Sequence, residues 1–515
     1  MDLLPDFDTF ARQWRAGKNQ TVRTSVVSDL ETPVSAMLKL GMGRPYSFLL
    51  ESMEGGAVRG RYSIIGREPD LIWRCERGGR VSINRDVLRG ATHFTPCSRA
   101  PMDDLRALLE ECRIDSPDQP QPMAAGLFGY LGYDTVRYME RLPEAKSEGV
   151  DVPEAVLIRP TLLAIFDQIE NKFALVTPAW FDSAETPEAA YERARAVLAR
   201  ALADLRRATP ETSPRSSAAG PELSPVPEPH RATGSAPPHS NMTEQNYCAM
   251  VEKAKRYIRA GDIFQVVLSQ RFAMPFSRHP LDLYRAVRRL DPSPFLFFFD
   301  FGDFAVVGSS PEILVRVRDG KITIRPIAGT RPRGQGNQSD GELKAELLAD
   351  PKELSEHLML LDLGRNDVGR FAKTGTVKVT ARNTIEYYRH VMHIVSNVEG
   401  ELDPRHTPLG ALMGGFPAGT VSGAPKIRAI EIIDELEPDH RGVYAGCIGY
   451  FGANGTMDTC IAIRTAVIKD GMMHVQAGAG IVYDSNPQAE YRECVAKARG
   501  LLKAAEEALG QNEAF

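Results

Sequence analysis

The chain has 515 residues, a formal net charge of −5 and 43% hydrophobic residues, values typical of a large globular protein. No basic cluster is interleaved with aromatic residues, so nucleic-acid binding is not indicated. The longest apolar run, residues 295–299, is too short to cross a bilayer, and we expect neither a membrane span nor a signal peptide. The seven cysteines include no C-x-x-C pair, so we expect reduced thiols and a cytoplasmic protein.

Composition divides the chain into three regions. Residues 1–205 alternate strand-like runs such as 61–66 with turns, and an Ala-, Arg- and Leu-rich helix is predicted over 188–207. Residues 206–240 are rich in Pro, Ser, Ala and Gly and have few large apolar residues, which predicts a flexible linker. Residues 241–508 are predicted to form a second domain, with which the N-terminal region is interleaved.

Strands outnumber helices in this second domain. One helix is predicted from Thr243 to Ala260, ended by Gly261, and others over residues 351–362 and from Val482 onward. Strand patterns occupy residues 264–272, 295–301, 305–308, 314–318, 321–325, 378–381, 391–398, 446–452, 457–467 and 472–478. This order favours an α+β fold of two packed, mainly antiparallel β-sheets flanked by helices, and it argues against a Rossmann fold.

The helix over 351–362 carries its own start pattern. Asp350 is a predicted N-cap, and Pro351 follows it in the first turn. Leu354, Leu358 and Leu361 recur at helical spacing, which predicts that they form the buried face of this helix.

Two Glu-x-x-Glu pairs are a candidate metal site. Glu353 and Glu356 lie on one predicted helix, and Glu490 and Glu493 lie on another. Residues three apart on a helix lie on the same side, with Cβ atoms about 5–6 Å apart. Four converging carboxylates would need a cation, and oxygen ligands in this number suit Mg²⁺. On spacing alone, two solvated helix faces are the commoner explanation.

Some polar residues occupy apolar segments. Arg464 lies in a predicted strand, where it either binds a carboxylate or forms a structural salt bridge. His393 lies on an apolar strand and is either a core histidine or an acid–base candidate. Arg331 and Arg333 form another possible anion site.

A series of short motifs follows in order from residue 241 to 505. They are GDIFQ (261–265), SPE (310–312), PIAGTRPR (326–333), LDLGRND (361–367), HIVS (393–396), residues 419–428, IRT (463–465) and QAGAGIV (476–482). Together they resemble the chorismate-utilising enzymes, and most closely the large subunit (component I) of anthranilate synthase. LLES (49–52) and RYSIIG (61–66) extend the resemblance into the N-terminal region.

The resemblance implies a lyase that converts chorismate and ammonia into anthranilate, the first step of tryptophan synthesis. It implies that Glu312 is the general acid that protonates the departing hydroxyl and that His393 serves the later loss of pyruvate. Gln265 occupies the catalytic position at which the relatives that deliver water have a lysine base, so ammonia is the implied nucleophile. Ala328 occupies a position where aminodeoxychorismate synthases often carry a lysine, and it argues against that activity. Aminodeoxychorismate synthase component I and an inactive regulatory homologue are the alternatives.

The resemblance also implies the ligand contacts. Mg²⁺ would be held by Glu356 and Glu493, with Glu353 and Glu490 close by or acting through water. The implied substrate-binding residues are Gly329, Thr330, Thr420, Tyr444, Arg464, Gly478, Ala479, Gly480 and Lys497.

Two partners follow from the same resemblance. The chain has no glutamine-amidotransferase nucleophile elbow, so a separate glutaminase subunit (component II) is implied, with free ammonium able to replace it. We therefore expect a hetero-oligomer. Tryptophan is the implied feedback inhibitor, and its expected site contains Ser52, Pro294, Phe295 and Leu296.

Overall fold

The computed structural model describes residues 1–27, 30–54, 58–115, 123–143, 146, 148–210, 238–334, 339–388 and 391–510. In these residues every pair of neighbouring strands is antiparallel, and all strands join one hydrogen-bonded network. The predicted fold class is therefore confirmed, and the parallel sheet of a Rossmann fold is absent from the described residues.

The network divides into two arms at the long strands β3 (Val58–Glu76) and β7 (Ala155–Asp167), which pair with each other. The first arm runs, in order of pairing, through β1 (Gln20–Val27), β8 (Lys172–Ala179), β7, β3, β2 (Ser47–Glu54), β11 (Phe295–Asp300), β12 (Phe304–Ser310), β21 (Thr465–Lys469), β22 (Met472–Ile481) and β10 (Gln265–Pro275), which also pairs with β9 (His239–Ser240) and β18 (Gly423–Ala424). The second arm runs through β5 (Thr95–Pro96), β4 (Arg80–Asn84), β3, β7, β6 (Gly126–Leu131), β19 (Cys447–Gly452), β20 (Met457–Ile461), β13 (Ile313–Arg318), β14 (Lys321–Ile324) and β17 (Val391–Glu401), with β15 (Ile327–Pro332) and β16 (Lys378–Tyr387) also paired to β17.

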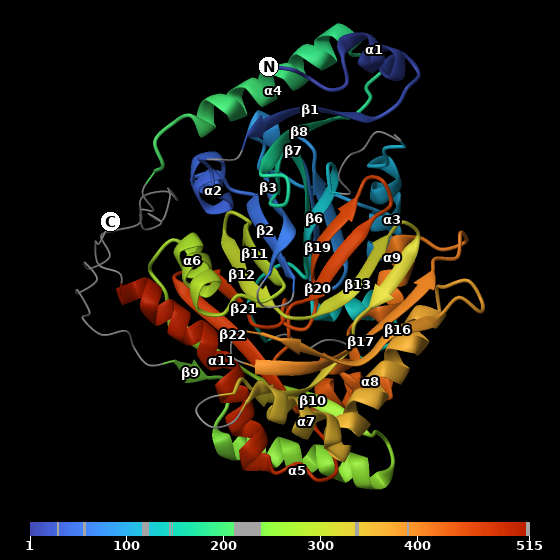
Figure 1. Ribbon diagram of the computed structural model, residues 1–515, viewed down its shortest axis with the longest axis vertical. Coiled ribbons are helices and arrows are strands. Elements are labelled where there is room, and N and C mark those ends of the chain that lie inside the picture. Colours follow the sequence, from blue (N-terminus) through green and yellow to red (C-terminus); the bar gives the residue numbers. More distant parts are fainter. Residues whose placement is uncertain are drawn as a thin grey trace.

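An aromatic core holds the two arms face to face. Phe48 of β2 stacks on Phe128 of β6 with ring centroids 4.7 Å apart, and Phe128 lies 5.6 Å from Tyr450 of β19. All three side chains are buried in one hydrophobic cluster that also includes Phe297 and Phe299 of β11. Strands from distant parts of the sequence therefore alternate in space, as the blue β2 beside the yellow-green β11 shows in Figure 1.

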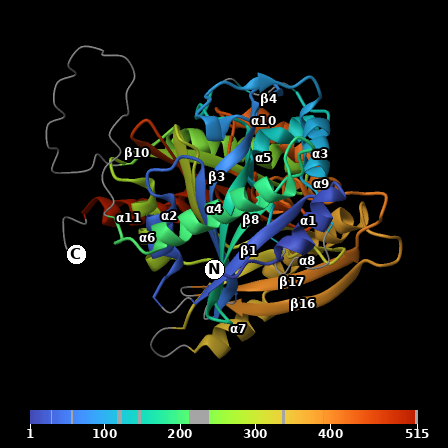
Figure 2. The ribbon, with the colours of Figure 1, turned by 90° about the horizontal axis from the view of Figure 1, so that it is seen from above.

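Helices cover the outside of the strands. Figure 1 and Figure 2 show α1 and α4 beside β1 and β8, whereas α5, α8 and α11 lie around β10, β17 and β22. The helices are α1 (Phe7–Arg15), α2 (Pro33–Gly41), α3 (Pro101–Glu111), α4 (Pro187–Leu205), α5 (Glu244–Ala260), α6 (Pro280–Leu290), α7 (Asp340–Ala349), α8 (Pro351–Gly369), α9 (Pro408–Gly415), α10 (Lys426–Leu436) and α11 (Pro487–Gly510), with 3-10 turns η1 (Val87–Arg89), η2 (Tyr133–Tyr138) and η3 (Gly419–Val421).

Local sequence patterns placed several boundaries well. Thr243 caps α5, and Gly261 ends it with a φ of 84°, a conformation that favours glycine. The Asp350 side chain accepts the backbone N–H groups of Lys352 and Glu353 at the start of α8, and Pro351 is its first residue. These predictions are confirmed. They could be made from the sequence because each depends on contacts within one turn.

Other predicted boundaries differ. The strand expected over 457–467 is two strands, β20 and β21, separated by a turn in which Arg464 has a φ of 48°. Leu358 is 52% exposed, so the buried face of α8 was predicted wrongly there. Leu361 is buried as predicted, and it shares the inward face with His357 and Leu360, which were not predicted. Helix α11 begins only at Pro487, and α8 continues to Gly369.

Three further expectations concern the whole chain. Most of the predicted linker, residues 211–237, lies outside the described residues. All seven cysteines are free. Among the helices of the described residues, none has the length and apolar character needed to span a membrane.

Candidate active site

Glu312 lies between β12 and β13 in a buried position. Its side chain is 7% exposed, and the Thr420 hydroxyl of η3 donates a hydrogen bond to its Oε1 atom at 3.1 Å. Burial raises the pKa of Glu312 to about 8, although the Thr420 hydrogen bond and the nearby Lys497 ammonium both lower it. The carboxyl group is therefore mostly protonated at neutral pH, as a general acid must be.

His393 lies on β17 opposite β15. Its Nδ1 atom is 3.0 Å from the Thr330 hydroxyl and 3.3 Å from the carbonyl oxygen of Gly329. Burial, helped by the positive charge of Arg464, lowers the pKa of His393 to about 4, so the ring is neutral at pH 7. A carbonyl oxygen only accepts hydrogen bonds, so we assign the proton to Nδ1, which leaves Nε2 as a base.

Gly329 allows this arrangement. Its φ is 71°, and the register between β15 and β17 shifts at this residue. A Cβ atom here would lie 3.0 Å from Ile394 and 3.2 Å from the Glu353 carboxylate. The glycine therefore lets Glu353 of α8 and Ile394 of β17 pack closely against β15, the strand that carries Thr330.

Gln265 and Tyr444 extend over the glycines of β22. A Cβ atom on Gly480 would lie 2.6 Å from Gln265 Nε2, and one on Gly478 would lie 2.8 Å from the Tyr444 hydroxyl. The Gln265 side chain is buried, and its Oε1 atom has no hydrogen-bond partner within the part of the chain that the structure describes. A buried amide oxygen without a donor is energetically costly, so it is a candidate ligand contact.

Lys497 of α11 connects β22 to the carboxylates. Its ammonium donates to the carbonyl oxygen of Gly478 at 3.0 Å and forms an ion pair with Glu493 at 2.8 Å. This single cation therefore lies among the backbone of β22, Glu493 and Glu312.

The two Glu-x-x-Glu pairs lie on α8 and α11, and Glu356 and Glu493 are close enough for their charges to interact. Burial raises the pKa of Glu356, and the negative charges of Glu353 and Glu493 raise it further. The pKa of Glu490 is raised by burial and by Glu493. Among the described residues, however, no three His, Cys, Asp or Glu side chains converge closely enough to hold a metal ion. Arg331 meanwhile forms an ion pair with Glu353 at 3.1 Å.

The carboxylate pairs nevertheless fit Mg²⁺ by their chemistry. This ion is usually held by one or two carboxylates, several waters and the substrate, so a preformed cage of protein ligands is not required. The pKa values of Glu356 and Glu490 are raised mainly by burial and further by the negative charges of neighbouring glutamates, and a divalent cation would stabilise the charged carboxylates against both effects.

The predicted arginines pair with carboxylates of the chain itself, which for Arg464 is the salt-bridge alternative. Arg464 lies in a turn, and its side chain is 33% exposed, with its guanidinium 3.5 Å from Asp291 and donating to Ser293 at 3.3 Å. Arg331 and Arg333 are engaged by carboxylates of the chain itself, including Asp350 and Asp340. The sequence did not reveal these pairings, because Asp340 lies on α7, a helix that was not predicted, and Asp350 was predicted only as the N-cap of α8.

A separate cavity of about 550 Å³ lies between the two arms, and all four residues predicted for tryptophan line it. Ser52 donates to the carbonyl oxygen of Tyr62 at 3.0 Å at its edge. The charged residues of its wall are paired, Arg316 and Arg318 with Asp458. The predicted residues in the cavity are Ser52, Pro294, Phe295 and Leu296, and those that sequence reasoning missed include Arg61, Tyr62, Met123, Arg316, Arg325, Glu386, Gly449, Tyr450 and Asp458.

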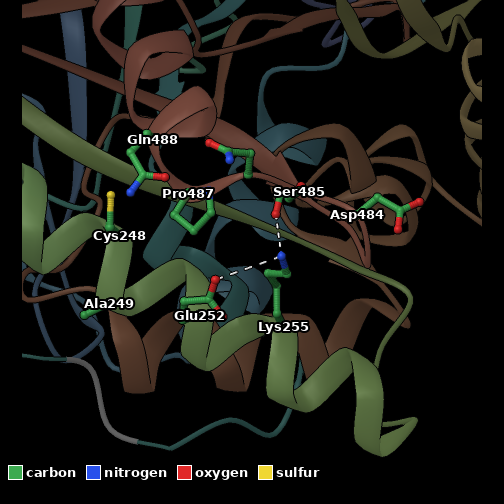
Figure 3. Close-up of a pocket in the computed structure, with 9 residues that line it drawn as sticks. Cys248, Ala249, Glu252, Lys255, Asp484, Ser485, Pro487 and Gln488 are labelled. Carbon is green, nitrogen blue, oxygen red and sulfur yellow. Dashed lines mark hydrogen bonds and ion pairs between the residues drawn. The ribbon is translucent and has the colours of Figure 1, made fainter.

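A second hollow, of about 560 Å³, lies on the surface between α5 and the segment before α11. Figure 3 shows Lys255 of α5 directed at Ser485, whose carbonyl oxygen accepts its hydrogen bond at 2.5 Å. No residue predicted for the active site lines this hollow.

Comparison with known proteins identifies the class. Residues 70–503 match the family described as chorismate binding enzyme. The chain therefore belongs to the chorismate-binding enzymes. It is 54% identical to anthranilate synthase component 1 of Cereibacter sphaeroides over 98% of both chains, and 45% identical to that of Pseudomonas putida over 96% of this chain and 97% of the relative.

A solved structure agrees with these relatives. The crystal structure of anthranilate synthase component I from Streptococcus pneumoniae is 35% identical in sequence, with a TM-score of 0.74 over 92% of this chain and 98% of that one. Within the chorismate-binding enzymes, the chain belongs to the anthranilate synthase component 1 group. The resemblance seen in the motifs is thus confirmed.

Proposed function

We propose that this enzyme converts chorismate and ammonia into anthranilate and pyruvate, and that it requires Mg²⁺. The observation that carries the choice of nucleophile is the buried Gln265 oxygen, which has no donor among the described residues. A neutral amide oxygen accepts a hydrogen bond from ammonia, but it is far too weak a base to activate water. The relatives named anthranilate synthase component 1 support the same choice.

The first step is amination of the ring. Ammonia forms a bond to C2 while the C4 hydroxyl departs as water, with its proton supplied by Glu312. Thr420 holds Glu312 in place through its hydrogen bond. Tyr444, Arg464 and the backbone of residues 478–480 would hold the enolpyruvyl carboxylate of chorismate.

The second step is loss of pyruvate, which makes the ring aromatic. It requires removal of a proton from the aminated carbon, and the neutral His393 ring has the free Nε2 atom to accept one. Thr330 and Gly329 hold the other ring nitrogen.

Glu356 and Glu493 would hold Mg²⁺, with Glu353 and Glu490 beside them or acting through water. A bound Mg²⁺ would offset the charge of the ring carboxylate and of the glutamates. Lys497 and Arg331, which now pair with Glu493 and Glu353, would balance the remaining charge.

A product assay tests the function directly. Purified chain, chorismate, Mg²⁺ and ammonium should yield anthranilate, identified by fluorescence and chromatography, and EDTA should abolish it. The para isomer would instead indicate aminodeoxychorismate synthase, and isochorismate would show that water, not ammonia, is the nucleophile. No product would favour the inactive homologue.

We also propose a glutaminase subunit as the physiological source of ammonia, in a cytoplasmic hetero-oligomer. The isolated chain should use ammonium but not glutamine, and addition of the partner subunit should restore glutamine-dependent activity. Glutamine-dependent turnover by the isolated chain would refute the need for a partner.

We further propose that tryptophan inhibits the enzyme from the cavity between the two arms. The cavity is large enough for an amino acid and combines apolar walls from β11 with the hydroxyl of Ser52. Pro311 and Ile313 line it, and they flank Glu312 in the sequence, so occupancy would act on the same backbone segment as the general acid.

A further inference from the structure

Glu437 and Arg441 form a buried ion pair behind the active site, after the end of α10. Their side chains are only 3% and 1% exposed, and the guanidinium donates to the carboxylate at 2.9 Å and 2.5 Å. Burying both charges carries a large desolvation cost, and a well-packed apolar pair is often as stable. Stability alone therefore explains this pair poorly.

The other donors of Arg441 hold two backbone segments of the active site. Its Nη1 atom donates to the carbonyl oxygen of Val421 at 2.6 Å, and its Nη2 atom donates to that of Val267 at 2.7 Å. Val421 follows Thr420, and Val267 lies two residues after Gln265 on β10. One guanidinium thus bridges η3 and β10.

Glu437 and the rings around Arg441 complete the connection. The Glu437 carboxylate accepts the backbone N–H of Ser269 at 2.7 Å and its hydroxyl at 2.9 Å, also on β10. The Arg441 guanidinium lies 5.5 Å from the ring centroid of Tyr444 and 4.7 Å from that of Tyr133. The pair therefore contacts three segments of the proposed active site.

We propose that the Glu437–Arg441 pair positions the catalytic residues: it fixes η3 against β10 so that Thr420 holds Glu312 and Gln265 keeps its place. This inference rests on the proposed function. Arginine suits the position because its planar fork serves a carboxylate and two carbonyl groups at once. Lysine keeps the charge, but its single nitrogen cannot reach all three acceptors.

The Glu312 carboxyl group reports the position of Thr420. Thr420 of η3 and the Lys497 ammonium of α11 are the groups that lower the pKa of Glu312 against the effect of burial. When η3 shifts and the Thr420 bond lengthens, the carboxylate loses that stabilisation, and its pKa rises.

The test compares Arg441→Lys with a matched control, Arg159→Lys. Arg159 is also buried in an ion pair, with Asp70 at 2.8 Å, and lies over the Trp180 ring, but it is in the N-terminal region away from Glu312. The pKa of Glu312 is measured in the whole chain by infrared difference titration against Glu312→Gln, a readout that needs no turnover. Turnover with chorismate and ammonium is measured alongside, with thermal unfolding as the stability control.

We expect Arg441→Lys to raise the Glu312 pKa and to lower kcat by about 10- to 100-fold with little change in KM for chorismate. Thr420→Ala should raise that pKa similarly, and the double variant should show no further rise. Arg159→Lys should destabilise the fold without moving the Glu312 pKa.

The proposal is overturned if both lysine variants leave the Glu312 titration unchanged, or if both move it alike. If Arg441→Lys does not fold, Ser269→Ala replaces it, because this variant removes the hydrogen bond from the Ser269 hydroxyl to Glu437. It should raise the pKa of Glu312 by a smaller amount. A Glu312 pKa equal to that of the wild type in Ser269→Ala would then overturn the proposal. A wild type that makes no anthranilate would refute the proposed function, while the infrared titration would still decide the positioning role.

Discussion

The proposed active site and the cavity between the arms differ in how their charged side chains are stabilised. Around Glu312 the titratable groups are displaced from their ordinary behaviour: the pKa of Glu312 is raised to about 8, that of His393 is lowered to about 4, and those of Glu356 and Glu490 are raised. In the cavity the charged side chains are neutralised by neighbours, such as Arg325 with Glu386. Perturbed pKa values are commoner at catalytic sites, and on the proposed function those around Glu312 serve the reaction, whereas the paired charges of the cavity leave its shape to determine binding.

Glu312→Gln should have the largest effect, because an amide cannot donate the proton that the departing hydroxyl needs. We expect kcat to fall about 10²- to 10⁴-fold. Glu154→Gln is the matched control, because Glu154 is also a buried glutamate with a raised pKa but accepts a hydrogen bond from Tyr138 in the N-terminal region. Equal losses in steady-state anthranilate production for both variants would remove the distinction between the site and other buried acids.

Glu356→Gln or Glu493→Gln should weaken Mg²⁺ binding. Outer-sphere substitutions typically cost about 10- to 100-fold in metal affinity, and a direct ligand should cost at least as much. Mg²⁺ titration followed by calorimetry and by activity measures the change, with the exposed Glu506 of α11 mutated to Gln as the control. An unchanged Mg²⁺ affinity in both site variants would exclude these helices as the metal site.

The pH dependence of kcat/KM for chorismate should be bell-shaped, because this ratio reports the pKa values of the free enzyme. Glu312 acts in its protonated form, so the rate should fall about tenfold per unit as pH rises above about 8. His393 acts in its neutral form, so the rate should also fall as pH drops through about 4. A single limb centred near pH 6.5, the ordinary range for histidine, would contradict these assignments.

Ser52→Phe tests the cavity side of the comparison. The larger ring should fill part of the cavity and raise the tryptophan concentration for half-inhibition by at least about tenfold, equivalent to about 1.4 kcal/mol of lost binding. Activity without tryptophan should change little. Ser277→Phe, at an exposed position, serves as the control. Equal inhibition of the wild type and Ser52→Phe would show that tryptophan binds at another site.

Gln265→Leu should have the smallest effect, because it removes one hydrogen bond to ammonia. A net contribution of about 0.5–1.5 kcal/mol corresponds to a loss of about 2- to 10-fold in kcat/KM for ammonium. KM for chorismate should stay near its wild-type value. A selective loss for chorismate instead would place Gln265 against the substrate ring and not the nucleophile.

How well a feature could be predicted from the sequence depended on how far apart in the chain its interacting residues lie. The caps of α5 and α8 and the shared side of Glu353 and Glu356 depend on residues within one turn, and they were read directly. The family motifs also pointed to Glu312 and His393 as catalytic candidates. Their burial, which sets their pKa values, depends on packing between distant strands and could not be read from spacing.

The missed features all depend on strand order or backbone geometry. Gly449 and Tyr450 reach the cavity because β19 pairs with β6, more than three hundred residues earlier in the chain. Arg464 has a positive φ, but no glycine at this position indicates such a backbone conformation in the sequence. Arg441 lies in an ordinary polar segment, and only the fold places it beneath η3.

The sharing of β3 and β7 by both arms also constrains how the chain can fold during its synthesis. Strand β2 cannot pair with β11, nor β6 with β19, until these later strands have been synthesised. The N-terminal region therefore leaves the ribosome with unpaired strand edges. Pairings of such long sequence separation form slowly, because the loop entropy is lost before the contacts are gained. A chain broken between α4 and β9 would yield two fragments whose unpaired strand edges are complementary. The two fragments would then have to associate with each other to complete the fold.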